Sequence, residues 1–282
     1  MKLELVDSLS LPGDPAKANE DAFGYREGAA VVLDGATGLG EKLLPGPSDA
    51  AWLARFGANR LMSYLGEGAS PNDAMTATFF DAHTSFAQLR RRAPAERYEY
   101  PFASLMLTAL SESVLDFLWY GDCAAILGQP GASAEIVGEA MEKRVRESAR
   151  VKQLANDRGE HAAAVSIRAQ YLPALRLMRN RVNTGKGGYL FGPDVTAADH
   201  AQTKRVCIKP QARLLLLSDG FLALASDYGL YDIEGLLDAA IKKGLPELAR
   251  ELRAAEEGDP DGRKFPRFKK SDDATAVLLR VD

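Results

Sequence analysis

The chain has 282 residues, of which 46% are hydrophobic and 26% are charged, and this balance is typical of a globular protein. Its 35 basic and 39 acidic side chains leave a net charge of −4, without the basic excess that nucleic-acid binding usually needs. The composition therefore excludes a disordered chain, a collagen and a coiled-coil rod, and we expect no nucleic-acid partner.

Cysteine content and apolar segments bear on where the protein works. The two cysteines, Cys123 and Cys207, form no CxxC pair, and with three histidines they leave little for a zinc site. So few cysteines fit a reducing compartment. The N-terminus lacks the apolar segment of a signal peptide, and no apolar stretch approaches the ~20 residues that span a bilayer. We therefore expect a cytoplasmic protein without a membrane partner. A monomer is the simplest expectation, although the sequence does not decide the oligomeric state.

The predicted strands come mostly in consecutive pairs. In chain order they cover residues 3–11, 22–28, 29–33, 102–110, 114–120, 123–127, 189–191, 205–208, 213–217 and 274–281. Helices are predicted after serine N-caps at Ser48 and Ser70, through most of 138–180 and over 233–255. Helices grouped between pairs of strands favour antiparallel sheets with helices packed outside, an α+β architecture, over a doubly wound parallel sheet.

Acidic residues stand beside glycine, or in pairs, at the ends of the predicted strands. They are Glu20-Asp21, Asp34-Gly35, Gly121-Asp122, Asp219-Gly220 and Asp272-Asp273. An acid at the end of a rigid strand can project into a shared cleft, and an adjacent glycine lets a ligand approach the backbone closely. Carboxylates gathered without basic partners repel one another, and a hard divalent cation bound through oxygen ligands is the usual remedy. Any one of these pairs alone is more often a hairpin turn, so the inference depends on their order and spacing together.

Five motifs in this order resemble the PPM family, the metal-dependent type 2C protein phosphatases, and look most like a bacterial branch. They span nearly the whole chain and read Asn19-Glu20-Asp21, Val31-Val32-Leu33-Asp34-Gly35, Tyr120-Gly121-Asp122-Cys123, Leu216-Leu217-Ser218-Asp219-Gly220 and Asp272-Asp273-Ala274-Thr275-Ala276-Val277. The resemblance implies two antiparallel β-sheets packed as a sandwich with helices on both outer faces. It also implies a single domain, residues 1–282, with a helical insertion or flap at about 138–185.

The resemblance assigns a metal centre to the acidic motifs. Asp34 would bridge two Mn²⁺ or Mg²⁺ ions, and the carbonyl of Gly35 would bind one of them. Asp219 and Asp272 would bind the other ion. Two metal ions that share a water molecule make a hydroxide nucleophile near neutral pH, so the catalytic role of these aspartates would be exerted through that water.

Three further acids have supporting roles by the same resemblance. Glu20 and Asp21 would lie near the metal ligands and hold metal-bound waters. Asp122 matches the aspartate that, with the counterpart of Asp219, can bind a third, weaker ion in this family.

Several positions depart from the family pattern, mainly where the substrate phosphate binds. The arginine that grips the phosphate is replaced by Ala16, and the adjacent Lys17 is the candidate substitute, as a point charge rather than a bidentate fork. The other departures are Ala36 for a proposed general-acid histidine, Ala103-Ser104 for a Gly-Thr/Ser-Thr pair, Cys123 for a serine and Asp273 for an asparagine.

Two basic segments offer other ligands for a phosphate. The predicted insertion carries Arg144, Arg146, Arg150, Arg176, Arg179 and Arg181, any of which is a candidate for the missing arginine. The loop before the last strand carries Arg263, Lys264, Arg267, Lys269 and Lys270, with Phe265 and Phe268 between them. We favour a solvated face for this loop, and the functional interpretation is recruitment of a phosphorylated substrate next to Asp272.

The sequence thus predicts a divalent-metal-dependent phosphomonoester hydrolase that acts on phosphoserine or phosphothreonine in a phosphorylated protein substrate. Two alternatives remain open. One is a catalytically weak or inactive relative that binds phosphoproteins, which the residues Ala16 and Ala103 suggest. The other is a phosphatase of small molecules.

Overall fold

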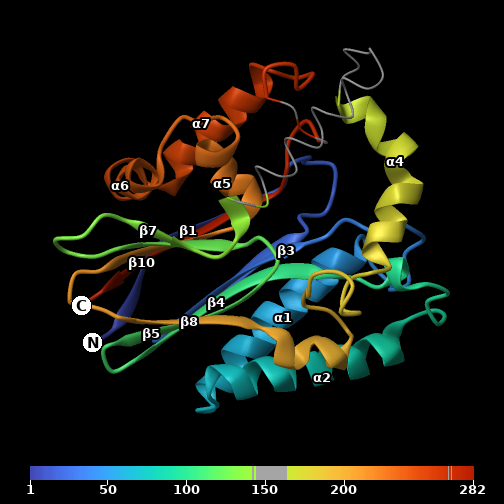
Figure 1. The fold of residues 1–282 in the computed structure, drawn as a ribbon, viewed down its shortest axis with the longest axis horizontal. Coiled ribbons are helices and arrows are strands. Elements are labelled where there is room, and N and C mark those ends of the chain that lie inside the picture. The colour runs from blue at the N-terminus through green and yellow to red at the C-terminus, as the bar shows by residue number, and fades with distance from the viewer. Residues whose placement is uncertain (142, 144–163, 266, 268) are drawn as a thin grey trace.

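The computed structural model describes residues 1–141, 143, 164–265, 267 and 269–282. Two five-stranded sheets, antiparallel throughout, pack face to face, and helices cover both outer faces (Figure 1). The predicted α+β sandwich is therefore confirmed. No helix in these described ranges is long and apolar enough to cross a membrane.

One sheet contains the first acidic motifs. Its strands, in spatial order, are β2 (Asp21–Arg26), β3 (Ala29–Gly35), β4 (Ala103–Ser111), β5 (Val114–Tyr120) and β8 (Gln202–Cys207). The helices α1 (Asp49–Gly66) and α2 (Pro71–Leu89) cover its outer face. Both helices begin at the predicted caps, because the hydroxyl of Ser48 accepts from the backbone N–H of Ala51 and that of Ser70 from Asp73.

The other sheet contains the C-terminal motifs. Its strands, in spatial order, are β1 (Leu3–Leu11), β10 (Ala274–Val281), β9 (Arg213–Leu217), β6 (Ala124–Gly128) and β7 (Glu135–Val137). Its outer face is covered by α5 (Asp219–Ser226), α6 (Ile233–Lys243) and α7 (Leu245–Glu257), which lie above the sheet in Figure 1.

The continuously apolar strands are explained by burial on both faces. In β3, Val31 and Leu33 pack in the core beneath α1, whereas Ala30 and Val32 pack in the core between the sheets. The strand β9 alternates in the same way between the inter-sheet core and the core beneath α5 and α6. A strand in the middle of four layers has no solvent face, so it shows no polar alternation in its sequence.

The structure differs from the predicted elements in several places. Residues 189–191 do not form a strand; only Phe191 makes an isolated bridge, to Ala103. The helices predicted over 233–255 are present as α6 and α7, and they meet at Gly244, whose φ of 84° breaks the helical path. The elements α5 and β7 were not predicted, since a helix of eight residues and a strand of three carry little periodic pattern.

The predicted insertion, about 138–185, is described only in part. Its helix α4 (Ala164–Arg179) confirms the helical prediction for that stretch. The short 3₁₀ helices η1 (Arg97–Glu99) and η2 (Val195–His200) are the remaining elements. Residues 142 and 144–163, and with them Arg144, Arg146 and Arg150, lie outside the described residues, as does Phe268.

We predict that Phe79→Ala lowers the free energy of unfolding by about 3–5 kcal/mol, because it opens a cavity in the core between α2 and its sheet. Phe79 is fully buried, and its ring centroid lies 5.0 Å from that of Phe191 and 5.4 Å from that of Tyr120. Denaturant unfolding measures the change. Phe80→Ala is the matched control, since Phe80 is 55% exposed and should cost less than about 0.5 kcal/mol. Equal losses in the two variants would contradict this account of the core.

Candidate metal centre

The acidic motifs come together at one end of the sandwich. In the first sheet, Asp21 at the start of β2 pairs in register with Asp34 near the end of β3. Asp34 in turn pairs with Ser104 at the start of β4. The hydroxyl of Ser104 donates to the carboxylate of Asp122, which lies in the turn from β5 to β6, where the chain passes from one sheet to the other.

The second sheet brings its acids to the same end. The backbone N–H of Ser218, after β9, donates to the carbonyl of Thr275 at 2.9 Å. The backbone N–H of Thr275 donates back to the hydroxyl of Ser218 at 3.0 Å. This reciprocal pair of hydrogen bonds holds Asp219 close to the loop before β10, which contains Asp272. Only glycine fits at position 220, because a Cβ there would lie 2.0 Å from the carbonyl oxygen of Asp273.

Electrostatics show how closely the carboxylates are gathered. Burial raises the pKa of Asp34 well above its ordinary value, and the charges of Asp219, Asp21, Asp122 and Asp272 raise it further. Burial likewise raises the pKa of Asp21, and the charges of Asp272 and Asp273 add to the effect. Four other predicted acids therefore act on Asp34 at short range.

The donor chemistry of this centre suits a hard divalent cation. Neither carboxylate oxygen of the buried Asp21 accepts a well-formed hydrogen bond among the described residues, although the hydroxyls of Ser218 and Thr275 are close enough to lower its pKa in part. Buried carboxylates without partners are costly, and Mn²⁺ or Mg²⁺ bound through oxygen ligands would remove that cost. Over the described ranges, however, no three His, Cys, Asp or Glu side chains already surround a common ion position. The residues fit the ions in chemistry and location, but their side-chain oxygens do not converge on one point.

Two lysines pair with the acids instead. The Nζ of Lys269 lies 2.6 Å from Oδ1 of Asp272, and the Nζ of Lys143 lies 2.5 Å from Oδ2 of Asp122. These partners supply positive charge at the positions predicted for the second and the third metal ion. In the sequence, Lys269 belongs to the basic segment before the last strand, whereas no pattern singles out Lys143.

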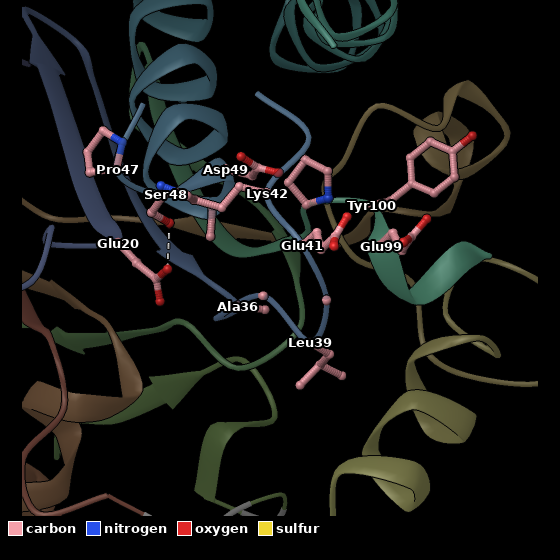
Figure 2. A pocket seen from close by; sticks show the side chains of 14 residues that line it. Glu20, Ala36, Leu39, Glu41, Lys42, Pro47, Ser48, Asp49, Glu99 and Tyr100 are labelled. Carbon is pink, nitrogen blue, oxygen red and sulfur yellow. Dashed lines mark hydrogen bonds between the residues drawn. The ribbon is translucent and has the colours of Figure 1, made fainter. Parts of the chain in front are cut away.

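Glu20 has a different set of contacts from the one that the resemblance implies. Its carboxylate accepts from the hydroxyl of Thr37 at 2.6 Å and from that of Ser48 at 2.5 Å, the second of which is drawn in Figure 2. Glu20 thereby connects the glycine-rich loop after β3 to the start of α1. It also lines a small pocket of about 170 Å³ beside Ala36 and Leu39 (Figure 2). Its predicted role in holding metal-bound waters stays a prediction.

The carboxylate of Asp273 explains one departure from the family pattern. Its Oδ1 accepts the backbone N–H of Gly13 at 2.7 Å, and its Oδ2 accepts that of Glu20 at 2.6 Å. Two acceptor oxygens are needed for two backbone donors, and an asparagine side chain has only one. Asp273 therefore fixes both ends of the loop between β1 and β2 against the metal centre, a role that the sequence did not indicate.

A groove of about 1140 Å³ opens beside the acids. It is lined by residues 11–18 and 269–273, together with Glu20, Thr37, Pro47, Ser48, Arg253, Glu256 and Glu257. Ala16, at the position of the expected arginine, lines this groove. Lys17 lines it too, but its side chain is 78% exposed and its Nζ lies 3.3 Å from Asp14. Lys17 therefore lies at the solvent edge of the groove.

The arginines of the insertion that can be placed have structural contacts. The Nε of Arg176 donates to the carbonyl of Leu39 at 2.8 Å, and its guanidinium lies 4.7 Å from the ring centroid of Tyr98. Arg176 thus attaches α4 to the glycine-rich loop and to η1, away from the groove. Arg179 ends α4, and Arg181 follows it; neither lines the groove.

Sequence comparison finds a family model that matches the C-terminal part of the chain. Residues 158–282 match the family model of stage II sporulation protein E (SpoIIE). No curated protein matches the sequence.

Structural comparison covers the whole chain. It is similar to the Mycobacterium tuberculosis serine/threonine phosphatase PstP/Ppp, with a TM-score of 0.58, 14% identity, and 100% of both chains covered. A structure of the PstP catalytic domain in complex with two manganese ions matches with a TM-score of 0.56 and 15% identity, covering 100% of this chain and 99% of that one. PppA, a regulatory component of T6SS in Pseudomonas aeruginosa, matches at 0.55 and 16% identity, over 99% and 98% of the two chains. At these identities the similarity establishes the fold.

We predict that Asp273→Asn lowers the free energy of unfolding by about 1–3 kcal/mol, because one of the two loop N–H groups loses its acceptor. Urea denaturation measures the loss, and faster amide exchange at Gly13 or Glu20 locates it. Asp14→Asn is the control: Asp14 lies on the same loop, and its Oδ1 accepts the N–H of Ala16, which an asparagine oxygen can still do. If Asp273→Asn is as stable as Asp14→Asn, Asp273 does not fix the loop between β1 and β2.

The raised pKa of Asp34 predicts how stability depends on pH in the presence of a chelator. The folded protein keeps the Asp34 proton after the unfolded chain, with its ordinary pKa near 3.8, has released it. Stabilisation present below pH 3.8 is therefore lost as pH rises through the raised, folded-state pKa. Asp34→Asn removes this titration and should be more stable than the wild type at pH 7 by about 1–3 kcal/mol. Saturating Mn²⁺ should reverse that order. Parallel stability-versus-pH curves for the two proteins would refute the prediction.

Proposed function

Because this chain has the SpoIIE-like fold of the PPM-type phosphatases, we propose that it is a divalent-metal-dependent phosphomonoester hydrolase. The substrate class that we propose is phosphoserine or phosphothreonine in a protein. The observation that carries the proposal is the meeting of five aspartates from both sheets at one end of the sandwich, beside an open groove. They are Asp21, Asp34, Asp122, Asp219 and Asp272.

Particular residues would hold the metal ions. We assign Asp34 and the Gly35 carbonyl to the first ion, and Asp34, Asp219 and Asp272 to the second. When bound, such ions supply a hydroxide nucleophile from water near neutral pH and positive charge against the phosphoryl oxygens. Mn²⁺ and Mg²⁺ both suit an all-oxygen site, and the two manganese ions of the PstP catalytic domain support the same stoichiometry here.

Several other residues hold the segments around this centre in place. The two oxygens of Asp273 hold both ends of the loop between β1 and β2, and Ser218 and Thr275 hold the ends of β9 and β10 together. Glu20 fixes the loop after β3 through Thr37 and Ser48. Loops fixed in this way would restrict the backbone movement of the segments that carry the carboxylates.

Cys123 does not supply a nucleophile, which supports a mechanism through activated water. Its side chain is fully buried in the core between the sheets. Burial and the neighbouring aspartates raise the pKa of its thiol well above the ordinary value. A cysteine nucleophile needs a lowered pKa and access to substrate, and Cys123 has neither.

The shape of the groove supports a protein substrate. Its volume of about 1140 Å³ exceeds the roughly 300–1,000 Å³ of typical small-molecule pockets, and it is bordered by loops rather than enclosed. A phosphorylated segment of another protein can lie in such a groove with its phosphate next to Asp272.

We predict that the purified protein hydrolyses an aryl phosphate with Mn²⁺ or Mg²⁺, and that a chelator abolishes the activity. Asp219→Ala should lower kcat/KM at least about 100-fold, because it removes a metal ligand. Asp238→Ala is the control, since Asp238 is a partly exposed carboxylate on α6 that pairs with Lys242. Activity that survives both chelator and Asp219→Ala would refute the proposed function. A comparison of phosphopeptides with phosphorylated metabolites then tests the substrate class.

A further inference from the structure

The groove lacks the arginine expected for a phosphate, yet other basic side chains line it. Lys269 and Lys270, from the loop before β10, line it together with Ala16 and Lys17. A phosphomonoester dianion at Asp272 requires at least one cationic side chain close to the reacting group. These residues, with Arg253, are the basic candidates among the described residues that line the groove.

Arg253 is already occupied. Its two terminal nitrogens donate to the carbonyl of Asp272 at 3.0 Å, and one of them also donates to the carbonyl of Pro12 at 3.1 Å. Its guanidinium also pairs with Glu256 at 2.8 Å. These contacts tie α7 to both loops of the groove, so Arg253 is a structural brace rather than a ligand for substrate.

Lys269 is the groove lysine nearest to the acids. Its Nζ lies 2.6 Å from Oδ1 of Asp272, and its side chain is 36% exposed. Lys17, by contrast, is 78% exposed at the edge of the groove and pairs with Asp14. Lys270 is exposed, and its side chain has no hydrogen bond or ion pair with the described residues.

The carboxylate of Asp259 holds the loop that carries Lys269 in place. The carboxylate of Asp259 accepts the backbone N–H groups of Arg263, Lys264 and Phe265. It also pairs with the guanidinium of Arg267 at 3.0 Å, and both side chains are almost buried. The basic residues of this loop thus have separate tasks: Arg267 fixes the loop, whereas Lys269 projects towards the acids.

We propose that Lys269 binds the substrate phosphate, in place of the arginine that is absent at position 16. The inference rests on the proposed function. A metal ion bound by Asp272 competes with Lys269 for the same carboxylate, and a phosphoryl group beside that ion offers the ammonium new acceptors. The flexible four-carbon stem of lysine allows this short movement. The ligand class is a phosphomonoester dianion, and inorganic phosphate has the same chemistry.

The test uses the full chain saturated with Mn²⁺ and inorganic phosphate as the probe. We expect Lys269→Met to weaken phosphate binding, measured by calorimetry and by product inhibition, about 10–100-fold. KM for an aryl phosphate should rise by a similar factor, and Lys269→Arg should stay within about 3-fold of the wild type. Affinity for Mn²⁺ in Lys269→Met should be equal or higher, because the variant removes a competitor from Asp272.

Lys270→Met is the matched control. It removes the same charge from the same wall of the groove, but from a side chain without contact to Asp272. We expect its phosphate affinity to change less than about 3-fold, which is the effect of a screened surface charge. Equal losses in Lys269→Met and Lys270→Met would show only a diffuse positive field and would overturn the proposal.

Two further outcomes would also overturn it. Unchanged phosphate affinity in Lys269→Met, with tighter Mn²⁺ binding, would make Lys269 a counter-ion of Asp272 alone. Weaker Mn²⁺ binding would make any loss of phosphate indirect. Thermal unfolding checks that the variant folds, and Lys269→Gln replaces it if not. Absence of metal-dependent turnover in the wild type would refute the proposed function, whereas phosphate binding to the Mn²⁺-loaded protein would still test Lys269.

Discussion

Repulsion among carboxylates gathered at one end of the sandwich is the constraint on which this site depends. Burial and four neighbouring acids raise the pKa of Asp34, and the carboxylate of Asp21 is buried without a well-formed hydrogen bond among the described residues. Such an arrangement opposes folding unless positive charge compensates it. Functional sites commonly lower the stability of the fold in this way. The unpaired oxygens that destabilise the fold are also the groups that can bind a cation.

The structure compensates this repulsion with backbone donors and lysines. Asp273 accepts two loop N–H groups, which lets a carboxylate lie at the centre without adding an unpaired charge. Lys269 and Lys143 pair with Asp272 and Asp122. A metal ion at either aspartate would compete with a lysine of the same chain, so metal affinity would depend on the position of these lysines. Among the described residues, no lysine is paired with Asp34.

Lys269, which lines the same groove as Ala16, is the proposed replacement for the missing arginine. Where a fork-like guanidinium would approach a phosphate from the N-terminal loop, this chain offers a point charge, Lys269, from the loop before β10. A lysine makes fewer directional hydrogen bonds than an arginine and moves more freely. Recognition of substrate would then depend more on the bound ions and less on a rigid clamp.

The sequence by itself determined the strand pairs, the two serine-capped helices, the α+β class and the acids at the strand ends, because these features depend on local patterns. It could not determine which sheet each strand joins, since a strand that is apolar on both faces carries no sign of its neighbours. It also could not show that Glu20 binds Thr37 and Ser48, or that Lys269 and Lys143 pair with the acids. The contacts of Glu20 and the Lys143–Asp122 pair join residues 17 to 28 positions apart, which only the folded chain brings together. The Lys269–Asp272 pair is local, but it depends on the conformation of the loop before β10, which no periodic pattern in the sequence specifies.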